Sequence, residues 1–263
     1  MTARVRLDSL LAERGLFPSR SKAAAAVMAG EVRIEGAPAA KPGQLVHEDL
    51  HLEVAERPRF VSRGGQKLEA ALEETGVNPA GRLCLDVGAS TGGFTDCLLQ
   101  AGALEVVAVD VGYGELAWQL REDPRVHVLE RTNARNLEVG QLPFRPDLIV
   151  ADCSFISLTK LLPAVLATAA ERYDALVMVK PQFELGKGRV GRGGVVRERH
   201  ERAEAVLAVA EFARDRCGAS VVGFASSRLP GPKGNRETFV HLAESGRGGG
   251  PSDLDDALGE VDL

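Results

Sequence analysis

The pattern of apolar and polar residues changes at about residue 82. From there on, seven short apolar runs follow one another, and stretches with helical spacing near 93–101, 115–122, 157–170 and 200–216 separate several of them. The runs read RLCLDVGA, LEVVAVDV, VHVLE, DLIVADCS, ALVMVKP, SVVGFASS and TFVHLAE. Because strands separated by helices form parallel sheets that helices cover on both faces, the sequence predicts a doubly wound, mostly parallel α/β domain of Rossmann-like type.

Residues 1–56 follow a different pattern. In RLDSLLAERGL the leucines share one helical face, and Gly15 is placed to end the helix. The alanine-rich stretch PSRSKAAAAVMAG predicts a second helix that Ser19 or Ser21 caps and Gly30 ends. Alternation in EVRIEG and QLVHEDLHLEV predicts short strands. Together these elements predict a small α+β domain.

The sequence therefore divides into four segments. They are a small domain at 1–56, an interdomain linker at 57–64, the α/β domain at 65–243, which opens with a helix near Gly65, and a tail at 244–263. The tail holds six acidic residues against Arg247 alone, and its run GRGGGPSD favours disorder. We expect a disordered acidic appendage there.

Charge is distributed unevenly along the chain. The net charge is −5, and the tail alone accounts for it. Residues 1–46 hold seven basic residues against four acidic ones. A local basic face of this kind is what phosphate binding requires, whatever the overall charge.

The cellular setting is suggested by what the sequence lacks. The four cysteines are scattered without a CxxC pair, so neither a disulfide framework nor a metal site is expected. No window approaches the roughly 20 apolar residues that cross a bilayer, and the charged N-terminus does not resemble a secretory signal. We expect a cytoplasmic protein with no membrane partner.

A glycine-rich turn follows the first strand of the α/β domain. In DVGASTGGFTD a strand ends at Asp86 and a helix begins near Gly93, at the crevice where such sheets bind nucleotides. A dinucleotide fingerprint would need glycine where Ser90 stands, and no P-loop lysine follows. Asp110, about twenty residues on, can accept hydrogen bonds from ribose hydroxyls in NAD and S-adenosylmethionine alike. The predicted cofactor residues of this region are Asp86, Gly88, Ala89, Ser90, Thr91, Gly92, Gly93, Phe94 and Asp110.

Two lysines and two carboxylates form the candidate catalytic set. Asp152 and Lys180 end consecutive strands, Glu237 opens a late strand, and Lys67 lies on the helix before the sheet. Lys180 ends a buried apolar run, where a charge is costly unless it is partnered or functional, although it could also reach solvent as an ordinary strand-end lysine. A desolvated lysine can act as the base that a weakly nucleophilic ribose hydroxyl needs. The set thus favours methyl transfer to a 2′-hydroxyl.

Other methyl acceptors fit less well. An exocyclic amine would call for an Asn/Asp-Pro-Pro-aromatic run, but the chain has Asp152-Cys153-Ser154-Phe155 at that point. A cytosine-C5 enzyme needs a cysteine nucleophile, typically after proline, and Cys153 lacks that context. The sequence alone therefore leaves a nucleophilic Cys153 as an alternative.

Taken together, these motifs resemble the TlyA (hemolysin A) family of ribosomal-RNA 2′-O-methyltransferases over about residues 4–242. RLDSLLAERG, SRSKAAAAVMAGEVRIEG and KPGQLV resemble an S4 RNA-binding domain, and SRGGQKLEAAL, DVGASTGGFTD, ADCSFISL, VKPQFE and GNRETF resemble an FtsJ/RrmJ-type methyltransferase domain. The resemblance places a catalytic tetrad at Lys67, Asp152, Lys180 and Glu237. It implies S-adenosylmethionine as cofactor, with Asn133 near the adenine and Asp152 also beside the cofactor, and cytidine 2′-hydroxyls of ribosomal RNA as targets.

RNA contacts are expected from basic residues in both domains. The S4-like segment has Glu35-Gly36 where such domains commonly have asparagine-glycine. After Lys180 comes a glycine-rich basic loop that could close over RNA. The predicted phosphate contacts are Arg4, Arg6, Arg20, Lys22, Arg33, Lys41, Arg63, Lys187, Arg189 and Arg192. With 5% aromatic residues, recognition should depend on RNA shape and backbone.

Two further functions are alternatives. The first is a non-catalytic RNA-binding protein on the same fold, which would bind without transferring methyl groups. The second is a membrane-active hemolysin, which the family name suggests but the lack of a long basic amphipathic helix disfavours. We expect a monomer whose partners are ribosomal subunits.

Overall fold

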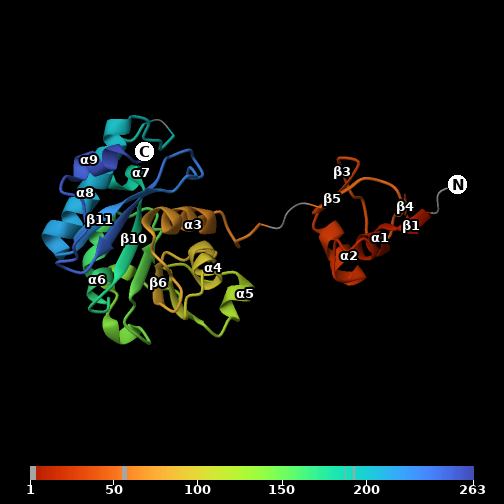
Figure 1. Cartoon of the computed structure of the whole chain (residues 1–263), viewed down its shortest axis with the longest axis horizontal. Helices are drawn as coiled ribbons and strands as arrows, with labels where there is room; N and C mark the ends of the chain where they lie inside the picture. Colours follow the sequence, from red (N-terminus) through yellow and green to blue (C-terminus); the bar gives the residue numbers. More distant parts are fainter. Residues whose placement is uncertain (1–3, 55–57, 187, 192) are drawn as a thin grey trace. The chain divides into compact units, whose positions relative to one another are not determined.

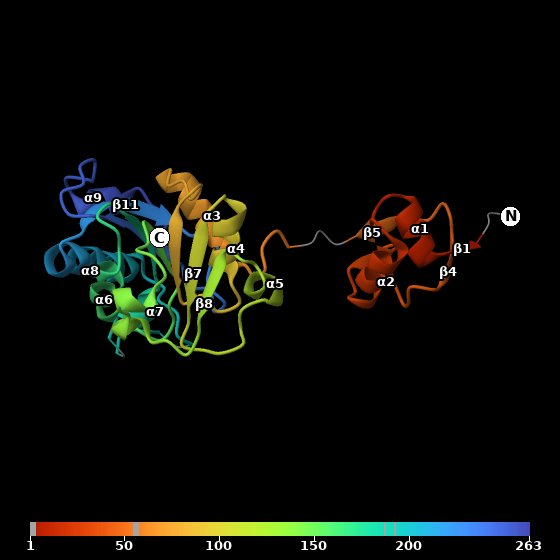
Figure 2. The same cartoon turned by 90° about the horizontal axis from the view of Figure 1, so that it is seen from below.

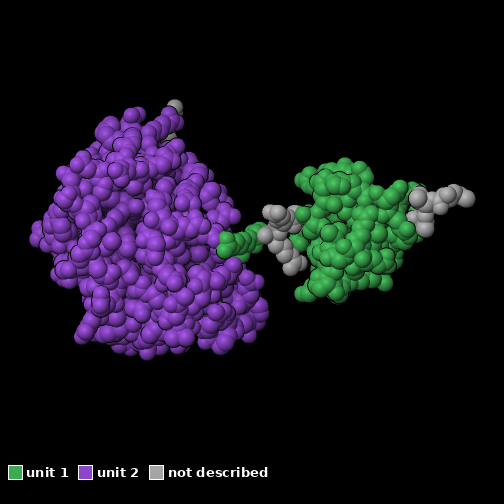
Figure 3. Space-filling model, viewed as in Figure 1, with its two compact units in different colours: residues 1–59 green, residues 60–263 purple. Residues whose placement is uncertain are grey.

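The computed structural model describes residues 4–54, 58–186, 188–191 and 193–263. The chain forms two compact units, residues 1–59 and 60–263 (Figure 3). The division falls inside the stretch expected to be a linker. Each unit has its own hydrophobic core and is described separately.

The smaller unit consists of two helices and short strands. Helix α1 (Leu7–Glu13) is followed by Gly15 at φ +70°, and α2 (Arg20–Met28) is capped by Ser19, whose side chain accepts from Lys22 N (3.3 Å). The strands are β1 (Arg4–Arg6), β2 (Val32–Ile34), β3 (Ala37–Pro38), β4 (Leu45–His47) and β5 (Leu52–Val54). Strand β1 pairs with β4, and β2 lies between β3 and β5. Both predicted helices are therefore present.

The core of the smaller unit comes from one face of each helix. Leu7 and Leu11 of α1 are fully buried, and α2 adds Ala23 and Val27. Val32 of β2 completes the packing. The leucine spacing in the sequence thus becomes the contact between the two helices.

The larger unit is built on a sheet of seven strands in the described part of the chain, ordered β11-β12-β10-β9-β6-β7-β8. These strands are β6 (Leu83–Val87), β7 (Glu105–Val109), β8 (Val126–Leu129), β9 (Leu148–Ala151), β10 (Asp174–Val179), β11 (Ser220–Ser226) and β12 (Thr238–Ala243). Strands β6 to β10 are parallel, whereas β12 is antiparallel to β10 and β11. The predicted α/β fold is confirmed, and each predicted apolar run is a strand.

Strand order reverses between β6 and β9. The chain proceeds from β6 outward to β7 and β8, then returns to β9 and β10 on the other side of β6. At such a point the loops after two adjacent strands lead away in opposite directions, which opens a crevice at their carboxyl ends. This reversal determines where a ligand can bind.

Helices cover both faces of the sheet (Figures 1 and 2). One face carries α3 (Gly64–Thr75), α4 (Gly93–Gln100) and α5 (Trp118–Arg121), and the other carries α6 (Leu162–Ala167), α8 (Arg199–Cys217) and α9 (Leu254–Gly259). The remaining helical segments are α7 (Pro181–Glu184) and the 3-10 turns η1 (Ala134–Asn136), η2 (Val139–Gln141) and η3 (Leu158–Lys160). The helices predicted near 115–122 and 157–170 are both shorter than expected. In the second, Pro163 lies in the first turn of α6, where it limits how early the helix can start.

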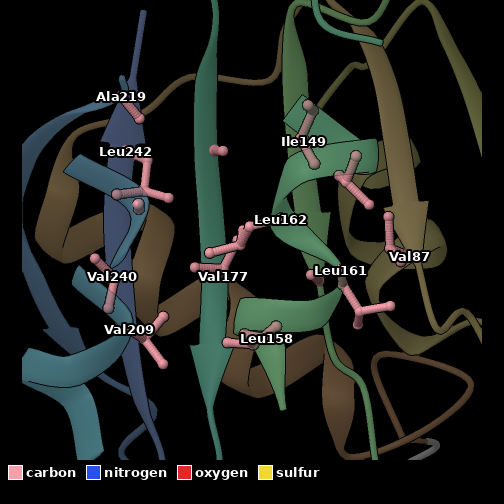
Figure 4. Packing of buried hydrophobic residues seen from close by; sticks show 14 of the residues in the cluster. Val87, Ile149, Leu158, Leu161, Leu162, Val177, Val209, Ala219, Val240 and Leu242 are labelled. Carbon is pink, nitrogen blue, oxygen red and sulfur yellow. The ribbon is translucent and has the colours of Figure 1, made fainter. Parts of the chain in front are cut away.

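Neighbouring residues of each central strand face opposite layers. In β10, Leu176 packs with the α3 and α4 layer and Val177 with the α6 and α8 layer. Figure 4 shows the cluster on the α6 and α8 side of the sheet. In it, Leu162 lies against Val177, and Val209 lies near Val240. Strands buried on both faces read as continuous apolar runs, which is the pattern seen in the sequence.

The tail at 244–263 differs from the prediction of a disordered appendage. Asp253 caps α9 by accepting from Asp255 N (2.8 Å) and Asp256 N (3.1 Å). Leu258 and Leu263 are 1% and 3% exposed in the core beside α8. The acidic residues concealed an apolar spacing that forms one helical face, so the charge count was a misleading guide here.

Candidate active site

The turn between β6 and α4 lies at the strand-order reversal. Gly88 has φ +84°, and a Cβ there would lie 2.6 Å from the carbonyl oxygen of Asp152. Gly93 packs equally closely on the segment before α3, since its Cβ would lie 2.2 Å from Ser62 Oγ. Glycine at these positions lets the turn approach both neighbouring segments, and two cavities open on its two sides.

The first cavity, of about 470 Å³, lies beyond the ends of β6, β7 and β9. Asp110 follows β7, and its carboxylate accepts from Ser90 N (2.8 Å) and Gly112 N (2.7 Å). Asn133 follows β8 and accepts from Arg135 N (3.1 Å). The predicted cofactor residues that line this cavity are Gly88, Ser90, Asp110, Asn133 and Asp152. Carboxylate and amide groups on an otherwise mostly apolar wall suit a nucleoside.

Asp86 lies beneath the turn, outside both cavity linings. It is fully buried, and Thr95 Oγ1 donates to its Oδ2 (2.6 Å). Its Oδ1 has no hydrogen-bond partner among the described residues. Burial raises the pKa of Asp86 to about 7. Gly92 also lines neither cavity, because the side chains of Leu120 and Leu116 occupy the space beside it.

The second cavity, of about 310 Å³, holds the four catalytic candidates. Lys67, Asp152, Lys180 and Glu237 all line it, together with the predicted cofactor residues Gly88, Ala89, Ser90, Thr91, Gly93 and Phe94. Strand register explains the convergence. Thr238 of β12 pairs with Val179 of β10 in antiparallel register, which brings Glu237 to the edge where β10 ends. Lysine and carboxylate positions far apart in sequence therefore meet at one edge of the sheet.

The four side chains form two ion pairs. Lys67 Nζ donates to Glu237 Oε2, and Lys180 Nζ pairs with Asp152 Oδ1. Lys180 Nζ also donates to Ser154 Oγ (2.9 Å). The Lys67–Glu237 side chains are 8% and 2% exposed, whereas those of Lys180 and Asp152 are 12% and 22% exposed. The second pair is therefore the more accessible to a ligand.

The two cavities share part of their lining. Gly88, Ser90, Asp152 and Ser154 border both. A molecule that fills the first cavity can thus extend towards Lys180 at the junction. This continuity is what a two-substrate transfer reaction needs, because the reacting atoms must meet in a fixed geometry.

The loop after β9 contains residues that the sequence analysis missed as site residues. Phe155 has φ +66°, is 91% exposed, and its ring lies 5.2 Å from that of Phe183. Glu184 holds this loop by accepting from Ser157 Oγ (2.5 Å) and Leu158 N (2.9 Å), and burial raises its pKa. A bulky residue in the left-handed region is strained and often marks a functional loop, but a sequence carries no signal for it.

Cys153 does not have the environment of a nucleophile. Its Sγ donates to the carbonyl oxygen of Val87 (3.5 Å), and burial raises the thiol pKa to about 12. Because the thiolate is the reactive form, this cysteine is chemically quiet at neutral pH. Cys153 therefore does not suit the role of nucleophile that methylation at cytosine C5 would require.

The described basic residues predicted to contact RNA are all exposed. In the smaller unit these are Arg4, Arg6, Arg20, Lys22, Arg33 and Lys41. In the larger unit, Arg63 lines the second cavity and donates to the carbonyl of Pro230 (2.8 Å), while Arg189 pairs with Glu204 of α8. Lys187 and Arg192 lie outside the described residues.

Comparison with known proteins matches both units. Residues 60–244 match the family of FtsJ-like methyltransferases, and residues 5–52 match the S4 domain. The chain thus combines an S4 domain with a methyltransferase domain of the FtsJ class.

Full-length relatives identify the family. The chain is 52% identical to the 16S/23S rRNA (cytidine-2′-O)-methyltransferase TlyA of Mycobacterium tuberculosis, over 98% of this chain and 97% of the relative. It is 38% identical to Hemolysin A of Brachyspira hyodysenteriae, over 90% of this chain and 99% of the relative. A solved structure from Streptococcus thermophilus, provisionally described as a hemolysin, covers 99% of this chain and 96% of its own at 37% identity and a TM-score of 0.73. The chain belongs to the TlyA family of methyltransferases.

Among the described residues, no helix is both long enough and apolar enough to cross a bilayer.

Proposed function

We propose that this protein transfers a methyl group from S-adenosylmethionine to the 2′-hydroxyl of a cytidine in ribosomal RNA. The observation that carries the proposal is the meeting of Lys67, Asp152, Lys180 and Glu237 around one cavity that adjoins a nucleoside-sized cavity. The relative from Mycobacterium tuberculosis is named for this activity on 16S and 23S rRNA.

The first cavity is the proposed cofactor site. Among the described residues, the Asp110 carboxylate accepts from two backbone N–H groups, and each oxygen has a further lone pair for a ribose hydroxyl. Asn133 lies on the same wall, where an adenine edge would be recognised. When bound, the cofactor would supply a methyl group on a sulfonium. Asp86 lies beneath the turn and would not contact the cofactor directly. It would instead affect the shape of the turn and the electrostatic field of the site.

The second cavity is the proposed acceptor site. A ribose hydroxyl becomes an effective nucleophile when its proton is removed as the new C–O bond forms. Lys180 is the proposed base, whose Nζ accepts that proton and then releases it to solvent. Asp152 and Ser154 hold Nζ in place. The Lys67–Glu237 pair lines the same cavity and contributes to its electrostatic field.

The smaller unit is the proposed RNA-docking device, since an S4 domain with an exposed basic surface suits a phosphate backbone. We propose that the protein acts in the cytoplasm on ribosomal subunits, as a monomer with an S4 domain at about 1–56 and a methyltransferase domain at about 65–243.

The decisive experiment measures transfer of radiolabelled methyl to unmodified 30S and 50S subunits, followed by digestion of the rRNA. Label on ribose 2′-oxygen is the expected result. Label on a base would overturn the catalytic assignment. Binding of subunits and cofactor without transfer would favour a non-catalytic RNA-binding protein.

A further inference from the structure

In the smaller unit, a buried carboxylate lies between two exposed arginines. Asp8, in the first turn of α1, is 3% exposed. Arg6 donates to it through Nε (3.0 Å to Oδ1) and Nη2 (2.8 Å to Oδ2), and Arg20 Nε lies 3.2 Å from Oδ2. One carboxylate therefore brings together two cations from different elements of the fold.

This arrangement presents its cationic side to solvent. The side chains of Arg6 and Arg20 are 45% and 58% exposed, against 4% for that of Asp8. The hydrogen bonds from Arg6 are the main cause that lowers the pKa of Asp8 to about 2, so the carboxylate is ionised at neutral pH. Because both guanidinium groups keep a large part of their surface in solvent, they remain available to a further anion while Asp8 holds them.

The neighbouring turn leaves room for the Arg6 guanidinium. A Cβ at Gly43 would lie 2.9 Å from both Arg6 Nη1 and Nη2. The turn is held against α1 because Leu7 N donates to Gln44 O and Asp8 N to Pro42 O, each at 3.0 Å. A side chain at position 43 would therefore push Arg6 away from Asp8.

We propose that Asp8 is a positioning residue for RNA binding, which holds Arg6 and Arg20 together as a preformed clamp for the phosphodiester backbone. The inference rests on the proposed function, in which this unit docks on rRNA. Arginine binds phosphate best through the planar fork of its guanidinium. Without Asp8 the two cations repel each other, and each side chain must be ordered at the moment of binding.

The proposed clamp and the net charge predict opposite effects on RNA affinity when the Asp8 carboxylate is removed. Removing a carboxylate makes the protein more basic, so charge alone predicts tighter binding to RNA. We expect Asp8→Asn to weaken the binding of the full-length protein to unmodified 50S subunits on the order of tenfold, the size expected when two long side chains lose their preorganisation. Glu13→Gln is the matched control, because it removes one exposed carboxylate from the same helix.

A double-mutant cycle separates positioning from a purely structural role. In an Arg6→Ala/Arg20→Ala background, Asp8→Asn should cause no further loss of 50S affinity, because the groups that it positions are gone. An additive loss would overturn the proposal, as would an Asp8→Asn variant that binds as tightly as Glu13→Gln.

A second variant tests the clamp even if Asp8→Asn does not fold. Arg6→Lys/Arg20→Lys keeps both charges and Asp8 but removes both guanidinium forks, and it should lose affinity to a similar extent. Unchanged affinity of this lysine variant would overturn the clamp even if Asp8→Asn unfolds the smaller unit. Methyl transfer by the wild-type chain is measured in parallel, since its absence would be a failure of the proposed function, not of the clamp. With transfer intact, we expect Asp8→Asn to raise KM for the subunits and leave kcat nearly unchanged.

Discussion

The two lysine–carboxylate pairs of the active site differ in burial and in origin. Lys67 lies on α3 and Glu237 just before β12, and both side chains are buried. Asp152 and Lys180 follow adjacent parallel strands; Asp152 lines both cavities and Lys180 lines the second. A buried pair must compensate the cost of desolvating both charges, so loss of either partner is expensive. The more open pair can exchange its partner for a ligand. This difference supports the proposal that the first pair shapes the site and the second takes part in the reaction.

The largest effect expected is on turnover in Lys180→Ala. Loss of the proposed base should lower kcat by about a thousandfold, within the range of general base catalysis. Because the side chain is at a cavity wall, cofactor affinity and the melting temperature should change little. Single-turnover methyl transfer and calorimetric titration of the cofactor measure both quantities. A variant that retains a tenth of wild-type turnover would remove Lys180 from its assigned role.

Substitutions in the buried Lys67–Glu237 pair should change stability as well as activity. Glu237→Gln leaves the Lys67 ammonium buried without a counter-charge, and we expect the free energy of unfolding to fall by about 3 kcal/mol. Lys67→Met/Glu237→Leu removes both charges and should recover most of that stability while remaining inactive. Urea denaturation of the three proteins tests the prediction. If Glu237→Gln and the wild type were equally stable, the Lys67–Glu237 pair would not be buried in solution.

Asp86 is a third buried carboxylate, and no lysine pairs with it among the described residues. Its pKa of about 7 lies above the unfolded value, so the folded state binds the proton more tightly, and this group's contribution to stability falls as pH rises from about 4 to 7. Asp86→Asn should therefore raise the melting temperature of the cofactor-free protein at pH 8, by several degrees, and much less at pH 5. Thermal melts across this pH range measure it, with exposed Glu122→Gln as the control for loss of one charge.

The smallest effect is expected at Ser154, which accepts from Lys180 Nζ at 2.9 Å. Asp152 still holds the amine in Ser154→Ala, so kcat should fall by less than about tenfold. Loss as large as that of Lys180→Ala would mean that the hydroxyl, not the carboxylate, determines the position of the amine.

The sequence predicts the strands that carry this site better than it predicts the contacts between its side chains. Apolar runs marked every strand of the larger sheet, and the residues at their ends include Asp110, Asp152 and Lys180, because carboxyl ends of parallel strands share one edge. The sequence does not show the pairing of Lys67 with Glu237, which depends on the antiparallel register of β12. Likewise, the strained backbone at Phe155 comes from tertiary contacts that no local pattern encodes.

The tail and Asp8 show how charge can mislead in opposite ways. The acidic composition of 244–263 suggested disorder, although Leu258 and Leu263 are among the most buried residues of the described chain. In the smaller unit, a count of basic residues found Arg6 and Arg20 but passed over the carboxylate that joins them. Position relative to neighbours, rather than sign or number, gives each of these charges its effect.

The wall shared by the two cavities has a thermodynamic consequence. Asp152 borders both, so any change in its hydrogen bonding on one side alters the field that Lys180 experiences on the other. Occupancy of one cavity and affinity in the other are then linked, and the linkage must be equal in both directions. If the cofactor and its RNA acceptor bind on the two sides of this carboxylate as proposed, each should change the affinity of the protein for the other.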